Sequence, residues 1–243
     1  MSDFKDKVVL VTGAGRGIGR AAALAFAAQG AIVAANDISP MGVEAAVDQI
    51  VQSGGRAKAY VYDVAKRMPV QAMIDEILTD YEHLDIVINN AAVAPRASIL
   101  EMDEWDWHRV VDVNLGGPFF TMQHAGRAMR QQGSGVIINI ADSAGRTGGI
   151  AGRSAYLASK AGLIGLSREA AREFAAYGIR VNAVCPGIIV SGLAVSPELQ
   201  AAIPQGRAGS LENVVSVILF LCSPAAEYIV GQAVHVDGGL VML

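Results

Sequence analysis

Short apolar runs rich in Val and Ile alternate along this chain with longer stretches whose apolar positions recur every three or four residues. Runs of the first kind predict buried strands, and stretches of the second kind predict helices. The predicted strands comprise residues 7–12, 31–36, 58–62, 86–88, 136–140, 180–184 and 232–236. The predicted helices comprise residues 20–29, 41–53, 70–81, 102–129, 155–177 and 211–222, and the fourth has a possible break at residues 116–118.

Strand and helix alternate throughout, which is typical of a parallel sheet with helices on both faces. No linker or shift in composition divides the 243 residues, so we expect a single α/β domain over residues 1–243. Ligands of such sheets bind at the carboxyl ends of the strands. The candidate ligand-binding residues that follow predicted strands are 13–19, Asp37, Asp63, Asn90, Asp142, Ser143, Pro186 and Gly187.

Composition narrows the class of protein. Hydrophobic residues make up 52% of the chain and charged residues only 17%, which favours one large core and apolar surface buried between subunits. The net charge is −4 without a block of like charges, so we expect no nucleic-acid partner.

Cysteine and histidine give no sign of a metal site. Cys185 and Cys222 lie in apolar surroundings without paired spacing, which predicts buried free thiols in a reducing compartment. The four histidines are scattered and lack the spacing of metal ligands. The first seven residues do not resemble a signal peptide, and no apolar run approaches the ~18 residues needed to span a bilayer. We therefore expect a soluble, cytoplasmic protein.

Glycines occupy positions 13, 15, 17 and 19, directly between the first predicted strand and its helix. Glycines let the backbone approach a pyrophosphate, and the following helix N-terminus offers free N–H groups and partial positive charge. Asp37, eighteen residues after Gly19, ends the second strand and is placed to accept a hydrogen bond from a ribose 2′-hydroxyl. The spacing Gly13-x-x-x-Gly17-x-Gly19 alone fits any glycine-rich turn. Within strand, turn, helix, strand and Asp, it predicts dinucleotide binding.

Tyr156 and Lys160 lie four residues apart in a predicted helix, so their side chains share one face. An ammonium group beside a phenol lowers the phenol pKa from its usual value of about 10, which suits a general acid or base. The same spacing at Tyr62 and Lys66 falls at a strand end, and the pair alone usually indicates no more than two side chains on a helix surface. Unlike Tyr62, Tyr156 follows a predicted buried strand and a loop that carries hydroxyl groups, and this context favours a catalytic role for Tyr156.

Several motifs occur in a fixed order along the chain. They are Thr12-Gly13-x-x-x-Gly17-Ile18-Gly19, Asp63-Val64, Asn89-Asn90-Ala91, Asn114, a Ser before Tyr156-x-x-x-Lys160, Pro186-Gly187 and Val236-Asp237-Gly238-Gly239. Together they resemble the short-chain dehydrogenase/reductase family over nearly the whole chain. The tail and the Tyr region look most like 3-oxoacyl-carrier-protein reductases and related ketone reductases.

The resemblance implies a single Rossmann-type, doubly wound parallel sheet with helices on both faces. It implies an NAD(P)(H)-dependent oxidoreductase that interconverts a secondary alcohol and a ketone, with 3-oxoacyl-type reduction as one form of that reaction, and a homotetrameric assembly. The nicotinamide cofactor supplies the hydride chemistry.

The resemblance also implies roles for particular residues. Tyr156 exchanges a proton with the substrate oxygen, Lys160 lowers the Tyr156 pKa and holds the nicotinamide ribose, and Asn114 supports a water that leads protons away. A Ser hydroxyl, which we place at Ser143, binds the substrate oxygen. The implied cofactor-binding residues are Gly13, Arg16, Gly17, Ile18, Gly19, Asp37, Asp63, Val64, Asn90, Tyr156, Lys160, Pro186, Gly187, Ile189 and Ser191.

The chain departs from the family pattern before Tyr156. Counted from the strand, whose family pattern is Asn-Ile-x-Ser, the serine position holds Asp142; counted back thirteen residues from Tyr156, it holds Ser143. An ionised Asp cannot donate a hydrogen bond to an oxyanion, so we favour Ser143. Asp142 at this position would imply an altered mechanism. A second departure puts Ser191 where the family has Thr, which keeps the hydroxyl.

The choice of dinucleotide depends on two charges. The Asp37 carboxylate would repel a 2′-phosphate, whereas Arg16 resembles a basic residue of NADP-using relatives. The repulsion is the more direct effect, so we favour NAD(H) over NADP(H), with Arg16 either solvated or paired with Asp37.

Residues 188–204 follow the nicotinamide end of the predicted sheet and are mostly small or apolar, so we expect a flap over a compact ketone or alcohol. The alternative function is a catalytically silent dinucleotide sensor or scaffold of the same fold. The presence of both Tyr156 and Lys160 favours the enzyme.

Overall fold

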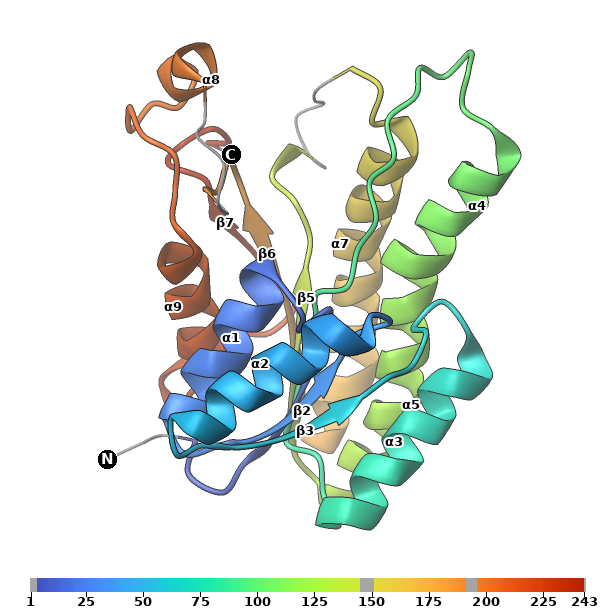
Figure 1. The fold of residues 1–243 in the computed structure, drawn as a ribbon, viewed down its shortest axis with the longest axis vertical. Helices are drawn as coiled ribbons and strands as arrows, with labels where there is room; N and C mark the ends of the chain where they lie inside the picture. The colour runs from blue at the N-terminus through green and yellow to red at the C-terminus, as the bar shows by residue number, and fades with distance from the viewer. Residues whose placement is uncertain (1–3, 145–150, 191–195, 243) are drawn as a thin grey trace.

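A seven-stranded parallel sheet forms the centre of the computed structural model, which describes residues 4–144, 151–190 and 196–242. The strands lie in the order β3-β2-β1-β4-β5-β6-β7 (Figure 1). Their bounds are β1 Val8–Thr12, β2 Ile32–Asn36, β3 Arg56–Tyr60, β4 Ile86–Asn89, β5 Gly135–Ile140, β6 Ile179–Pro186 and β7 Ala233–Val236. The predicted fold class, a doubly wound parallel sheet between helices, is confirmed.

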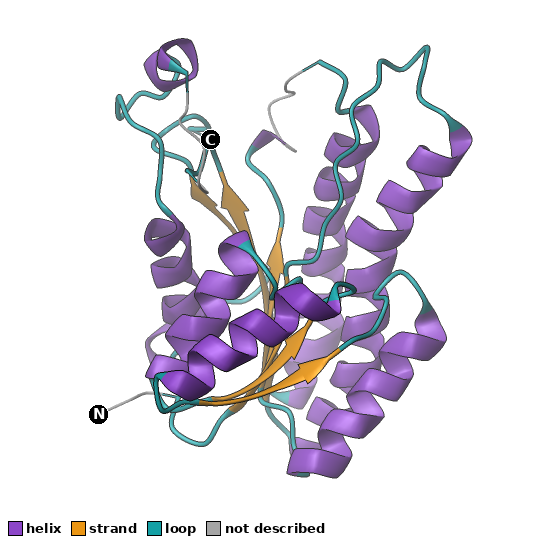
Figure 2. Ribbon diagram, viewed as in Figure 1, coloured by secondary structure: helices purple, strands orange, loops and turns teal. Residues whose placement is uncertain are grey.

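Helices cover both faces of the sheet (Figures 1 and 2). One face carries α1 (Gly17–Ala28), α2 (Pro40–Gln52) and α9 (Leu211–Cys222). The other carries α3 (Arg67–Tyr81), α5 (Gly117–Gln132) and α7 (Ser154–Phe174), with α4 (Glu104–Val111) beside α7. The shorter described helices are α8 Pro197–Ala201 and the single turns η1 Asp112–Gly116, η2 Ala175–Tyr177 and η3 Pro224–Ala226.

The two faces of each strand enter different cores. In β1, Val9 and Val11 belong to the core beneath α1 and α9, whereas Val8 and Leu10 belong to the core beneath α3, α5 and α7. Side chains alternate between the faces of a strand, and both faces here are covered, so all four are fully buried. This double burial explains the continuous apolar runs that predict the central strands.

The strand predicted at residues 58–62 begins and ends two residues earlier, at Arg56 and Tyr60. Parallel pairing with β2 fixes this register, because Ile32 lies opposite Arg56 and Asn36 opposite Tyr60. The Asn36 side chain then donates hydrogen bonds to the carbonyl oxygens of Tyr60 and Tyr62, which holds the chain where the strand ends.

The helix predicted over residues 102–129 is divided by the wider π-helical turn η1. Pro118 cannot donate a backbone hydrogen bond, and its ring would clash with the carbonyl of residue 114 in a regular α-helix. A π turn just before a proline relieves that conflict. The turn also places Asn114 at the interior of the molecule, where it is fully buried.

Candidate active site

A cleft of about 1040 Å³ runs along the carboxyl ends of β1, β2, β3 and β4 and reaches α4. Seven of the predicted cofactor-binding residues line it: Gly13, Arg16, Gly17, Asp37, Asp63, Val64 and Asn90. Its position is the one at which doubly wound sheets bind nucleotides. The structure therefore brings these seven predicted residues together in one cleft.

The glycine turn at the mouth of this cleft requires glycine for two reasons. Gly13 and Gly17 adopt φ values of +64° and +56°, in the left-handed region that other residues rarely occupy. At Gly19 a Cβ would lie 2.2 Å from the Gly13 carbonyl oxygen and 2.4 Å from the Asn90 Nδ2. The Asn90 side chain fastens the turn to the end of β4 by donating to the carbonyl oxygens of Thr12 and Gly13.

Helix α1 begins at this turn and presents its N-terminus to the cleft. Its N-cap residue Arg16 makes no side-chain cap hydrogen bond, so no side chain competes with an anion for the first N–H groups. A Cβ on Gly17 would meet no atom within 4 Å, which shows that this side of the turn is open. An uncapped helix N-terminus behind an open glycine turn fits a pyrophosphate.

Asp37 connects the glycine turn to the end of β2. Its Oδ2 accepts a hydrogen bond from the Gly15 N–H at 3.0 Å, and its Oδ1 accepts one from the Ser39 N–H at 3.0 Å. No ion pair with Arg16 occurs in the part of the chain that the structure describes. Asp37 therefore lies at the cleft edge without a cationic partner among the described residues.

The remaining predicted cofactor residues lie elsewhere. Ile18 and Ile189 pack against the core beneath α1 and α9, and Gly187 donates its N–H to the Val236 carbonyl oxygen at 3.0 Å. Pro186 ends β6, on the far side of the cleft from β2. Ser191 and part of the segment 188–204 lie outside the described residues, whose nearest ranges end at 190 and resume at 196.

Tyr156 and Lys160 occupy one face of the first turns of α7, beyond the end of β5. The Lys160 Nζ lies 5.8 Å from the centre of the Tyr156 ring and donates a hydrogen bond to the Ile140 carbonyl oxygen at 2.6 Å. The Tyr156 hydroxyl donates to the Asp142 Oδ2 at 2.7 Å. The predicted pairing of phenol and amine on one helix face is thus present in the structure, with a carboxylate added to it.

The prediction that Ser143 lies beside Tyr156 is wrong. Ser143 is buried, and its hydroxyl donates to the Cys185 carbonyl oxygen at 2.9 Å, on the β6 side. Successive residues of an extended chain point in opposite directions, so only one of two neighbours at the end of β5 can face Tyr156. Asp142 is that neighbour.

The expected lowering of the Tyr156 pKa is also wrong in this structure. Burial of the phenol raises the Tyr156 pKa above its usual range, and the charge and hydrogen bond of Asp142 raise it further, against a lowering effect of Arg153. Burial lowers the pKa of Lys160 to about 8. The hydroxyl of Tyr156 therefore stays protonated at neutral pH.

Asn114 takes part in a buried hydrogen-bond chain that leads to Tyr156. Its Nδ2 donates to the Val93 carbonyl oxygen at 2.9 Å and to the Ser159 hydroxyl oxygen at 3.1 Å. Ser159 in turn donates to the Tyr156 carbonyl oxygen at 2.7 Å. The sequence analysis missed Ser159, although its place directly before Lys160 in the Tyr motif is a usable signal.

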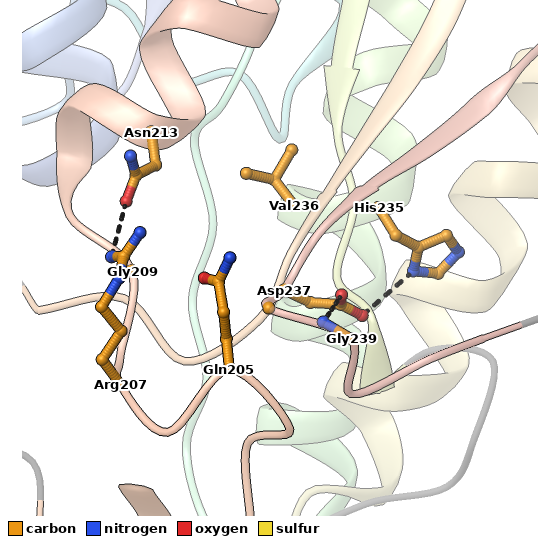
Figure 3. Close-up of a pocket in the computed structure, with 9 residues that line it drawn as sticks. Gln205, Arg207, Gly209, Asn213, His235, Val236, Asp237 and Gly239 are labelled. Atoms are coloured by element: carbon orange, nitrogen blue, oxygen red, sulfur yellow. Dashed lines mark hydrogen bonds and ion pairs between the residues drawn. The ribbon is translucent and has the colours of Figure 1, made fainter.

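A smaller cavity of about 310 Å³ lies beside the ends of β6 and β7 (Figure 3). There the His235 Nδ1 lies 3.6 Å from the Asp237 Oδ2, and Asp237 accepts hydrogen bonds from the N–H groups of Gly239 and Val241. The Asp237 carboxylate thus holds together the turn that directly follows β7.

Residues 4–144, 151–190 and 196–242 contain no group of three or more His, Cys, Asp or Glu side chains that could hold a metal ion. No helix in those ranges is both long and apolar enough to cross a membrane.

The cleft, the glycine turn and the Tyr156–Lys160 pair define a nucleotide-binding protein of the Rossmann type. The family described as enoyl-(acyl carrier protein) reductase matches residues 13–241. This chain belongs to the short-chain dehydrogenase/reductase family and is an NAD(P)-dependent oxidoreductase.

Known relatives match nearly the whole chain. The 3-oxoacyl-[acyl-carrier-protein] reductase FabG of Staphylococcus aureus (strain Mu50 / ATCC 700699) is 42% identical over 243 residues, covering 97% of this chain and 98% of its own. The FabG of Thermotoga maritima is 39% identical over 245 residues, covering 98% and 99%. A protein of Beutenbergia cavernae, assigned as an NAD(P)-dependent gluconate 5-dehydrogenase and crystallised with NADP at low occupancy, has a TM-score of 0.92 at 36% identity, covering 99% of both chains.

Proposed function

We propose that this enzyme interconverts a small secondary alcohol and a ketone, with NAD(H) favoured over NADP(H) and with 3-oxoacyl-type reduction as one form of that reaction. The observation that carries the proposal is the Tyr156 phenol, whose ring centre lies 5.8 Å from the buried amine of Lys160 at the end of the sheet. A nicotinamide dinucleotide would supply the hydride for such a reduction when bound. The names of the FabG relatives support the 3-oxoacyl form.

Different groups along the cleft would bind different parts of that cofactor. Gly13, Gly17 and the N-terminus of α1 would hold the pyrophosphate, and Asp37 would accept the ribose hydroxyl. Asp63, Val64 and Asn90 would continue the binding surface along the ends of β3 and β4. Tyr156 and Lys160, with Pro186, Gly187, Ile189 and Ser191, would complete it at the nicotinamide end.

In the direction of reduction, Tyr156 would donate its hydroxyl proton to the ketone oxygen. Its raised pKa keeps the phenol protonated at neutral pH, so the proton is present before a ketone binds. Lys160, whose pKa is lowered to about 8, can release and regain a proton near neutral pH and so restore the phenol. Asn114 and Ser159 would position this relay through their hydrogen-bond chain.

The test is the loss of reduced-nicotinamide absorbance when the enzyme is mixed with NADH or NADPH and a panel of ketones. Turnover of any ketone supports the proposal. Tight dinucleotide binding without turnover across the panel would instead support the alternative, a silent sensor or scaffold.

The cofactor preference depends on the free charge of Asp37. A half-buried carboxylate close to a 2′-phosphate weakens NADPH binding by roughly 1.5–3 kcal/mol, so Asp37→Ala should raise the NADPH/NADH ratio of kcat/KM by about 10- to 100-fold. The control is Asp48→Ala, which removes the same charge from an exposed position of α2. A ratio unchanged by Asp37→Ala would contradict the assignment of Asp37 to the ribose.

We also propose that residues 1–243 act as one NAD(P)-binding domain with a substrate flap at 188–204, in a cytoplasmic homotetramer without nucleic-acid or membrane partners. Exposed aromatic side chains on α4 and α5, Trp107 at 41% and Phe119 at 45%, support burial between subunits. Light scattering should give a mass about four times the 25.3 kDa of one chain. A monomer mass would contradict the assembly without affecting the chemistry.

A further inference from the structure

The Asp142 carboxylate occupies the place where a substrate must meet Tyr156. Its Oδ2 accepts the Tyr156 hydroxyl at 2.7 Å. A ketone oxygen that receives this proton must come within about 3 Å of the same hydroxyl, and therefore within about 6 Å of the carboxylate. No ketone can react at Tyr156 without entering the field of Asp142.

No cation forms an ion pair with this carboxylate within the described ranges. Asp142 forms no ion pair there; the Lys160 amine is directed to the Ile140 carbonyl oxygen, and the Arg153 guanidinium lies over the Tyr156 ring at 5.7 Å. The second carboxylate oxygen, Oδ1, accepts the Ala144 N–H at 2.8 Å. An ionised carboxylate has about four lone-pair sites and no donor, so Asp142 can accept further hydrogen bonds and donate none.

This arrangement presents any substrate with two difficulties. The single hydroxyl proton of Tyr156 is directed at Asp142, so Tyr156 must leave that partner to reach a ketone oxygen. The ketone oxygen also gains negative charge during reduction, which a nearby carboxylate opposes. A donor group on the substrate resolves both difficulties, because it replaces the phenol on Asp142 and offsets the charge.

We infer that Asp142 makes the active site selective for ketones that carry a hydrogen-bond donor, a hydroxyl or an ammonium group, on the carbon next to the carbonyl. This inference rests on the proposed ketone–alcohol function. The reaction balances in the ordinary way: an α-hydroxy ketone, a proton and reduced dinucleotide give a vicinal diol and oxidised dinucleotide. The carbonyl oxygen takes the Tyr156 proton, and the neighbouring hydroxyl stays on Asp142 unchanged.

The test compares ketones with the same carbon skeleton: 3-hydroxybutan-2-one, 3-aminobutan-2-one and 3-methoxybutan-2-one. The methoxy compound has a similar electron-withdrawing oxygen but no donor, so it controls for intrinsic reactivity. A hydrogen bond to a charged group changes kcat/KM by about 10- to 100-fold, which is the expected preference of the wild-type enzyme for the hydroxy over the methoxy ketone. The amino ketone shows whether ammonium is preferred to hydroxyl.

Two variants assign the preference to Asp142. Asp142→Ser replaces the carboxylate with a donor hydroxyl and should reduce the hydroxy/methoxy ratio to roughly threefold or less, mainly by raising the rate with the methoxy ketone. Asp142→Asn keeps the shape without the charge and should remove any preference for ammonium. NADH affinity should stay unchanged in both, and it reports folding independently of the chemistry.

The outcomes separate this inference from the proposed function. Equal kcat/KM for the hydroxy and methoxy ketones in the wild type, or the same ratio in both Asp142 variants, would overturn the inference alone. The inference alone would also be overturned if Asp142→Ser reduced the methoxy ketone while the wild type reduced none of the three ketones. Absence of turnover in every protein with every ketone and both cofactors would overturn the proposed function, and this inference with it.

Discussion

Tyr156→Phe is expected to lower kcat for ketone reduction by about a thousandfold, because a positioned general acid contributes roughly 10²- to 10⁴-fold. The substitution removes the proton that the ketone oxygen needs and leaves the ring in place against Lys160 and Arg153. The Kd for NADH should rise by no more than about threefold, because the ring stays in place at the nicotinamide end and the glycine turn and Asp37 lie on other strands. Single-turnover absorbance and fluorescence titration measure the two quantities.

Tyr62→Phe is the matched control. Tyr62 precedes Lys66 by the same four positions, but its hydroxyl donates to Glu76 at 2.7 Å, away from α7. It should keep nearly all the activity. If Tyr156→Phe kept more than about a tenth of wild-type kcat, Tyr156 would not be the proton donor.

The parts of the fold that could be predicted are those whose conformation is determined by residues close together in the sequence. β1 reads as a strand because its five residues are apolar and buried on both faces. The turn from Gly13 to Gly19 could be predicted because its glycines serve a backbone conformation and a close approach that no other residue allows. Tyr156 and Lys160 meet on one face because a helix brings positions four apart together.

The predicted bounds of the edge strand β3 lie two residues too far along the chain, because its start depends on distant partners and not on local sequence. Its charged side chains form ion pairs with residues distant in sequence. Lys58 pairs with Glu76 and Asp80 of α3, and Arg56 pairs with Asp6. These polar residues give no apolar run at the start of the strand. Only the pairing with β2 defines where β3 begins, and the residues of β3 alone do not predict that pairing.

Asp142 and Ser143 show how a one-residue ambiguity changes the chemistry. The count from the strand gave Asp142 and the count from Tyr156 gave Ser143. The structure places Asp142 beside Tyr156, as the count from the strand predicts. Strand β5 is paired on both sides, and this pairing fixes the positions of the residues directly after it. A count through a loop has no such constraint. The raised pKa of Tyr156 follows from the same position, since burial and Asp142 together outweigh the lowering effect of the Arg153 charge.

Gly19→Ala is expected to abolish dinucleotide binding, with a Kd for NADH raised at least about 100-fold. The added Cβ would overlap the Gly13 carbonyl oxygen at 2.2 Å and the Asn90 Nδ2 at 2.4 Å. Backbone on one side and a hydrogen-bonded side chain on the other leave it no room, so the glycine turn must move. A displaced turn no longer aligns the first N–H groups of α1 with a pyrophosphate.

The same overlap should lower the thermal midpoint by about 4–8 °C, the shift that about 2 kcal/mol of overpacking produces in a chain of this size. Gly165→Ala is the control, because a Cβ at Gly165 meets no atom within 4 Å on the exposed face of α7. Alanine there should raise the midpoint slightly, since it stabilises a helix interior relative to glycine. Unchanged NADH affinity in Gly19→Ala would show that the cofactor binds somewhere other than this turn.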